Sequence, residues 1–92
     1  MEFQYLLKRA NTIVFSEELK AEDIERFKDD IRDAAGLDVR IVRALLCDMK
    51  GEIVEAISRM NAINDWDKDK LRQKRMRTTI LITIIDDYYA FA

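Results

Sequence analysis

The sequence has no histidine, no proline and only two glycines among its 92 residues. Folds built from β-strands turn often and use glycine and proline in those turns, so their scarcity favours helices. Histidine is the commonest general base and a frequent zinc ligand, and its absence argues against an enzyme. We therefore expect no catalytic residue, no cofactor and no bound metal.

Cysteine and net charge are also scarce. The single cysteine, Cys47, cannot form an internal disulfide, and no signal-peptide pattern is visible, so we expect an intracellular, cytoplasmic protein. The 16 basic and 18 acidic residues leave a net charge of −2, which is too small to indicate nucleic acid or an anionic membrane by itself. The most apolar run, residues 80–85, is far shorter than the roughly 20 residues that span a bilayer, so we expect no membrane partner.

The clearest feature that is present is a stripe of apolar residues at alternating spacings of three and four positions, typical of one buried helix face. It consists of Val39, Val42, Leu46, Met49, Ile53, Ala56, Met60 and Ile63. We predict one long central helix over about 38–63. Leu45 and Ile57 widen the apolar face, which favours a three- to four-helix bundle over a narrow coiled coil. The length suits a single helical domain spanning 1–92.

Two shorter helices are predicted before the central one. Residues 2–14 place apolar side chains at helical spacing, and Ser16 is a candidate cap for a second helix that would end at Gly36 in a left-handed conformation. Asp38 is then the expected N-cap of the central helix, and Leu37 would pack on a residue one turn into that helix.

The region after the central helix is less uniform. Residues 61–69 are mostly polar and suit a turn, and a last helix from about Asp67 would place Leu81, Ile84, Tyr88 and Phe91 on one face. However, seven of the eight residues in 78–85 are β-branched, which favours strands. An α+β alternative therefore has strands near 12–15, 39–43 and 78–85, with a crossover helix over 21–35.

One segment, 68–77, concentrates positive charge in Lys68, Lys70, Arg72, Lys74, Arg75 and Arg77. On a helix these side chains would wrap around the axis rather than form one strip, which favours a solvated basic turn over phosphate binding. Its expected partner is the acidic segment 16–33, with eight acids and four bases, or another chain. Nucleic-acid binding through 68–77, with Arg72 and Arg75 as its test residues, is the alternative.

The C-terminal residues Asp86, Asp87, Tyr88, Tyr89 and Phe91 combine acids with aromatic rings, and Trp66 is a further exposed-contact candidate. The adjacent carboxylates could hold a magnesium ion, which gives a third hypothesis, a metal-dependent enzyme. We instead expect them to pair with basic side chains such as those of 68–77.

The sequence thus predicts a small interaction module that acts by binding another protein, as a regulator, inhibitor, adaptor or assembly subunit. The candidate contact residues are Trp66, Arg72, Arg75, Asp86, Asp87, Tyr88, Tyr89 and Phe91. We also expect self-association, with a homodimer among the partners considered.

Overall fold

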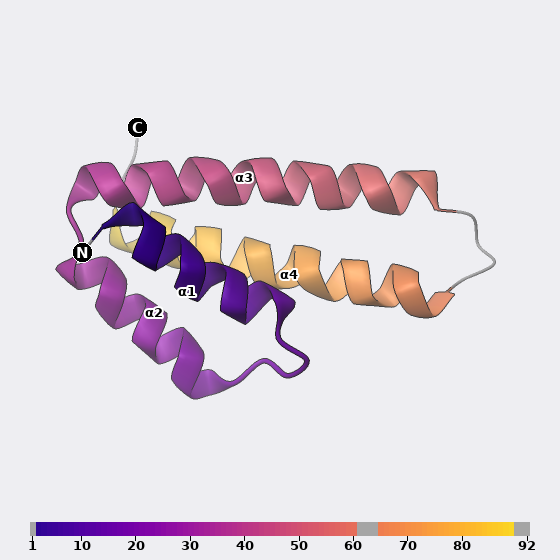
Figure 1. Ribbon diagram of the computed structural model, residues 1–92, viewed down its shortest axis with the longest axis horizontal. Helices are drawn as coiled ribbons and strands as arrows, with labels where there is room; N and C mark the ends of the chain where they lie inside the picture. Colours follow the sequence, from indigo (N-terminus) through magenta and orange to yellow (C-terminus); the bar gives the residue numbers. More distant parts are fainter. Residues whose placement is uncertain (1, 61–64, 90–92) are drawn as a thin grey trace.

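The computed structural model describes residues 2–60 and 65–89, and these form four α-helices and no strand. The predicted all-α bundle with one long helix is therefore confirmed. The helices are α1 (Phe3–Phe15), α2 (Ala21–Asp33), α3 (Gly36–Arg59) and α4 (Asp65–Tyr88). The chain folds so that α3 and α4 run antiparallel as a long hairpin, and their contact is the most extensive in the molecule (Figure 1).

The α+β alternative is wrong, because 12–15, 39–43 and 78–85 are all helical. The β-branched run is helical in α4, where its threonine hydroxyls form hydrogen bonds with the backbone. Thr78 donates its hydroxyl to the carbonyl oxygen of Lys74 at 2.7 Å, and Thr79 donates to that of Arg75 at 3.0 Å. These bonds one turn back remove the polar cost of threonine in a helix, and tertiary packing overrides the remaining propensity.

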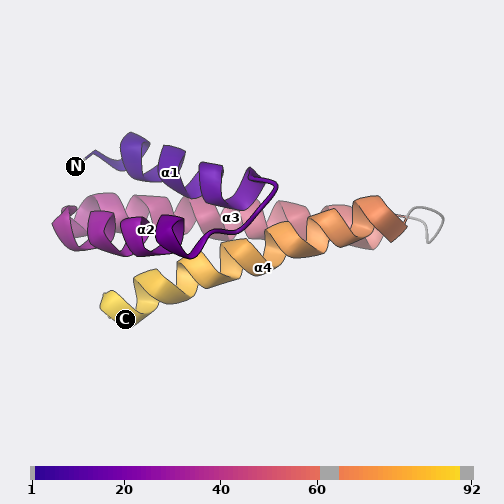
Figure 2. The same cartoon turned by 90° about the horizontal axis from the view of Figure 1, so that it is seen from below.

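The two short helices cover only one end of the long hairpin. Figures 1 and 2 show α1 and α2 beside the part of the hairpin that contains the start of α3 and the end of α4. We call this part the covered half, with residues 36–48 of α3 and 77–88 of α4. The remainder, 49–59 and 65–76, is the projecting half. This arrangement gives the molecule its elongated extents of 44 × 28 × 21 Å.

The core lies in the covered half, where all four helices meet. The predicted stripe of α3 faces this core, and Val39, Val42 and Leu46 are fully buried. The largest other fully buried side chains come from each remaining helix: Leu6, Ile13 and Val14 of α1, Phe27 and Ile31 of α2, and Thr78, Leu81 and Ile85 of α4. The stripe is thus confirmed over the described part of its length, but α3 ends at Arg59 rather than near residue 63. Ile63 lies outside the described residues.

Several predicted helix boundaries are wrong. Ser16 is the C-cap of α1, and the N-cap of α2 is Lys20. Gly36 does not end a helix in a left-handed conformation but is the first residue of α3, whose N-cap is Ala35 rather than Asp38. Leu37 is 70% exposed and therefore does not pack back on the helix. The chain turns here in extended backbone at Ala34 and Ala35, so neither a glycine turn nor a side-chain cap is used.

The inner face of α4 is also displaced from the predicted one. Leu81 is buried and Ile84 is half-buried as expected, but Tyr88 is exposed and Phe91 lies outside the described residues. The buried positions of α4 are Arg77, Thr78, Leu81 and Ile85. Within the described residues, no helix combines the length and the apolar character needed to cross a bilayer.

Candidate protein-binding surface

The structure separates the predicted contact residues into two groups along α4. Arg72 and Arg75 lie in the projecting half, whereas Asp86, Asp87, Tyr88 and Tyr89 lie at the opposite end of the helix. The nearest members of the two groups, Arg75 and Asp86, are eleven residues apart, which is roughly 16 Å at a rise of about 1.5 Å per residue. They do not form one surface. The side chain of Trp66 and all of Phe91 lie outside what the structure describes.

Asp86 forms an ion pair with Arg43 of α3 rather than with the basic segment 68–77. Arg43 binds its carboxylate with both sides of the guanidinium, Nε to Oδ1 at 2.6 Å and Nη2 to Oδ2 at 3.1 Å. The pKa of Asp86 is lowered, mainly because these hydrogen bonds favour the charged carboxylate, and the pKa of Arg43 is raised by the same contact. The predicted pairing with a basic side chain is thus confirmed for Asp86, but its partner is not in 68–77, because the antiparallel hairpin places Arg43, 43 residues away in sequence, beside the end of α4.

Tyr89 is half-buried and forms hydrogen bonds with the backbone at the end of α2. Its hydroxyl oxygen lies 3.2 Å from the carbonyl oxygens of both Ile31 and Ala34, to which the hydroxyl can donate. The last carbonyls of a helix have no partner within that helix, so this contact satisfies part of the end of α2. Tyr89 therefore has a structural position, whereas its neighbour Tyr88, whose ring meets that of Tyr89 edge-on, faces outwards.

Asp87 and Tyr88 border a groove between α2 and α4, with a volume of about 270 Å³. Its lining consists of Lys28, Ile31 and Arg32 from α2 and Ile84, Asp87 and Tyr88 from α4. The two isoleucines are its apolar part, since Ile31 belongs to the core and Ile84 packs against it. Opposite charges lie on its two walls. Asp86 and Asp87 thus lie on different sides of α4, against α3 and toward α2 respectively, and do not converge on one metal position.

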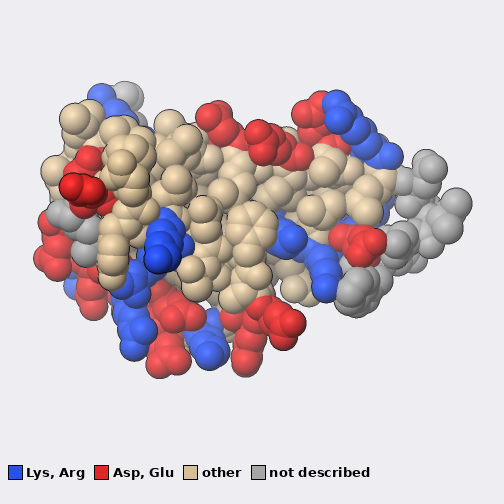
Figure 3. All heavy atoms as spheres, viewed as in Figure 1, with Lys and Arg blue, Asp and Glu red and all other residues tan. Residues whose placement is uncertain are grey.

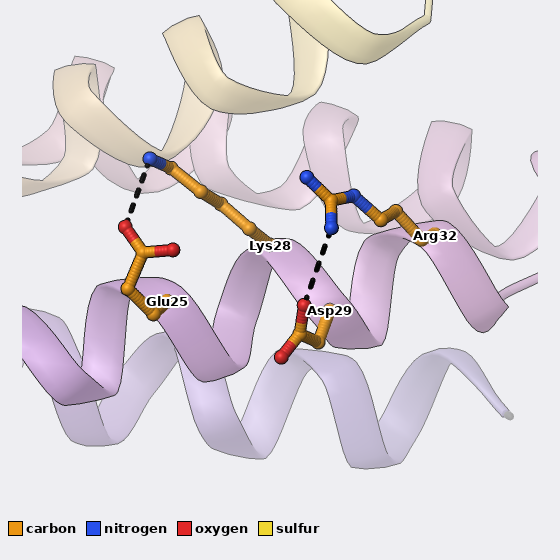
Figure 4. Close-up of polar contacts among 4 residues, drawn as sticks. All are labelled: Glu25, Lys28, Asp29 and Arg32. Atoms are coloured by element: carbon orange, nitrogen blue, oxygen red, sulfur yellow. Dashed lines mark hydrogen bonds and ion pairs between the residues drawn. The ribbon is translucent and has the colours of Figure 1, made fainter.

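The two cations of the groove are held only by their own helix. In Figure 4, Lys28 and Arg32 extend from the side of α2 that faces α4, each with an acidic partner one turn earlier. Lys28 Nζ lies 3.2 Å from Glu25 Oε1, and Arg32 Nη1 lies 3.5 Å from Asp29 Oδ1. These pairs are exposed, and exposed pairs of this spacing contribute little energy. A carboxylate of a partner protein can therefore replace Glu25 or Asp29 beside these cations at a small cost in free energy.

The sequence analysis did not identify Lys28 and Arg32 as candidate contact residues. Their spacing from a predicted core residue could have indicated that they border a groove. Both flank Ile31, a predicted core position, and a residue next to a buried stripe lies at the edge of an interhelical groove. What the sequence could not give was the neighbour across the groove, because α2 and α4 are about 50 residues apart in the chain.

The basic segment 68–77 is part of α4 rather than a turn, and its charges are dispersed. Arg72 pairs with Asp69 at 3.0 Å, and Arg75 is exposed. Arg77 is 5% exposed and donates hydrogen bonds to backbone carbonyls at the end of α1 and the following loop. Its contact with the 16–33 segment is therefore made through backbone oxygens and the Ser16 hydroxyl, not through carboxylates. Nucleic-acid binding by this segment stays a prediction, and Arg77 is not on the surface such binding would use.

No protein-family model matches the sequence, and neither the curated proteins nor the solved structures include one that is significantly similar to the chain.

Proposed function

We propose that this protein is a small helical interaction module that binds another protein through the α2–α4 groove. The observation that carries the proposal is the position of Tyr88, 51% exposed, in the lining of a groove that also contains the apolar Ile84 and charged residues on both walls. Protein interfaces combine a desolvated apolar centre with a polar rim, and tyrosine is enriched among the residues that dominate binding energy.

The charges around the groove define what a partner must present. Lys28 and Arg32 favour a carboxylate on the α2 wall, whereas Asp87 favours a basic side chain on the α4 wall. An apolar side chain between them would cover Ile84 and the ring of Tyr88. Charges at such a rim set orientation and association rate more than affinity. The roles of regulator, inhibitor, adaptor and assembly subunit, and the cytoplasmic setting expected from the single cysteine, belong to the same proposal.

The test is a capture experiment from an extract of the protein's native cells, with immobilised wild type, Tyr88→Ala and Tyr5→Ala. Tyr5 is the matched control, because it is 49% exposed but lies on α1, away from the groove. We expect wild type and Tyr5→Ala to retain the same protein in similar amount, and Tyr88→Ala to bind it at least about tenfold more weakly. Circular dichroism verifies that all three are folded.

Two results would contradict this proposal. One is equal retention of a specific protein by wild type and Tyr88→Ala. The other is retention of no protein above the level of bare resin. If Tyr5→Ala alone loses the captured protein, the binding surface is on α1 rather than in the groove.

A further inference from the structure

A second hollow lies between the end of α1 and the middle of α4, with a volume of about 410 Å³, within the usual size range of small-molecule sites. The α1 side and the loop after it contribute Val14, Phe15, Ser16 and Glu17, and α4 contributes Lys70, Gln73, Lys74 and Arg77. The hollow is distinct from the α2–α4 groove, since Arg77 and Asp87 are ten residues apart on α4, roughly 15 Å.

Arg77 forms the inner end of this hollow and is the most deeply buried charged side chain of the described residues. Its Nη1 lies 3.1 Å from the carbonyl oxygen of Ile13 and 3.2 Å from the hydroxyl of Ser16, and also contacts the Ser16 carbonyl. Nη2 lies 3.4 Å from the carbonyl oxygen of Glu17. All these acceptors are neutral. The buried Nε has no hydrogen-bond partner among the described residues.

These contacts compensate only part of the charge. The carbonyl end of a helix such as α1 corresponds to roughly half a negative charge, against the full positive charge of a guanidinium. Burying a charge without full compensation is costly. The local potential at Arg77 therefore stays positive and favours an anion in the adjacent space.

Two further cations line the same space. Lys70, Lys74 and Arg77 follow one another at spacings of four and three residues, which places them on one face of α4. Glu17 is the single carboxylate among the described lining residues. Positive side chains therefore outnumber negative ones in the lining that the structure describes. A phosphate monoester carries about −1.5 to −2 at neutral pH, so a positive lining attracts it more strongly than it attracts a single carboxylate.

Phe15 adds an apolar wall beside the cations. Its ring is 54% exposed, and Lys74 Nζ lies 5.1 Å from the ring centroid. A ligand with a planar group could contact this ring while its phosphate lies near Lys74 and Lys70, with the Gln73 amide as a further donor.

We propose that the α1–α4 hollow binds a small phosphate-bearing ligand, with the phosphate held by Lys70, Lys74 and the positive potential of Arg77 and with a planar group against Phe15. This site is independent of the groove through which we propose protein binding.

The proposal is tested by titrating the full-length protein at constant ionic strength with inorganic phosphate, a nucleoside 5′-monophosphate and the same nucleoside without phosphate. Amide chemical shifts in NMR spectra locate the binding. We expect both phosphates to shift residues around Phe15 and Lys74 at millimolar concentration, with the monophosphate binding more tightly. The nucleoside alone should produce no comparable shifts, because the cations supply most of the attraction.

The variant Lys70→Gln/Lys74→Gln should weaken phosphate binding at least about tenfold. Arg77 is left unchanged in this variant because it fastens α1. Lys8→Gln/Lys50→Gln is the matched control, since it removes the same charge from α1 and α3 outside the hollow, and we expect its affinity to stay within about twofold of wild type. Phe15→Leu should reduce the affinity for the monophosphate toward that for inorganic phosphate.

The proposal is overturned by the absence of localised shifts at about 10 mM phosphate, since this exceeds any useful affinity for the site. It is equally overturned if the two double variants weaken binding to the same extent, because that result indicates attraction by net charge alone. Equal affinities for the two phosphates would disprove the role of Phe15. Tighter binding of the nucleoside than of inorganic phosphate would disprove the role of the lysines.

Discussion

The two halves of the α3–α4 hairpin follow the same apolar pattern but differ in burial. In the covered half, Val39, Val42 and Leu46 are fully buried because α1 and α2 complete the core around them. In the projecting half, Ile53 is still buried, but Met49 and Ala56 are only half-buried and the outer Val54 is exposed. Figure 3 shows an uncharged area on this half, bordered above and below by side chains of both charges. The spacing of a stripe therefore sets which face turns inwards, whereas the neighbouring helices set how deeply it is buried.

The largest expected effect of the difference is on stability. Leu46→Ala in the covered half removes a fully buried side chain and should lower the free energy of unfolding by about 3 kcal/mol. Leu71→Ala in the projecting half makes the same chemical change at a half-buried position and should cost about 1 kcal/mol. Urea unfolding followed by circular dichroism measures both. Equal losses would show that the projecting half is as well covered in solution as the core, for example by a second copy of the chain.

A smaller effect is expected where the two halves meet. Arg77→Met keeps an apolar stem but removes the hydrogen bonds from the guanidinium to the carbonyls of Ile13, Ser16 and Glu17. Because a hydrogen bond that involves a charged group contributes roughly 1.5–3 kcal/mol, we expect a loss of about 2 kcal/mol in the free energy of unfolding. Hydrogen exchange of α1 amides should accelerate as well, since this helix loses its attachment to α4. Arg75→Met, an exposed neighbour, is the control and should change stability by less than about 0.5 kcal/mol. A similar loss in both variants would contradict the anchoring role of Arg77.

The sequence was sufficient to predict that the fold is all-α and which face of α3 is buried. The stripe from Val39 to Ile53 is long and regular enough that local propensity and tertiary packing agree. Helix ends were not predictable in the same way, because Ser16, Gly36 and Asp38 each fit a local capping rule that the tertiary path of the chain did not use. A Cβ at Gly36 would lie 3.8 Å from the ring of Tyr89, an ordinary contact, so no steric demand for glycine exists at that position.

The candidate surfaces were harder to predict than the fold because each is formed between distant segments. Tyr88 was identified from its residue type, but the groove beside it needs Lys28 and Arg32 of α2. Arg77 was grouped with its basic neighbours, and no pattern in the sequence distinguishes it from Arg75. Only the packing of α1 across α4 buries one of these arginines and exposes the other. Charge spacing in a sequence therefore indicates which face of a helix a side chain occupies, but not what lies opposite that face.

The smallest expected effect concerns the ion pair that joins α3 and α4 in the covered half. Because the pKa of Asp86 is lower in the folded protein than its ordinary value, the Arg43 contact stabilises the fold above the ordinary aspartate pKa of about 3.9. That contribution is lost as the pH falls through the lower folded value, where the carboxylate takes up a proton. The Tm of Asp86→Asn should therefore lie slightly below that of wild type at neutral pH, and the two should converge in acid. Asp87→Asn is the control, since Asp87 lies on the α2 side of the helix and makes no ion pair with α3 among the described residues; it should show no such convergence. Thermal unfolding from neutral pH to about pH 3 measures the difference, and a gap for Asp86→Asn that persists unchanged in acid would assign its effect to packing rather than to the charge of the pair.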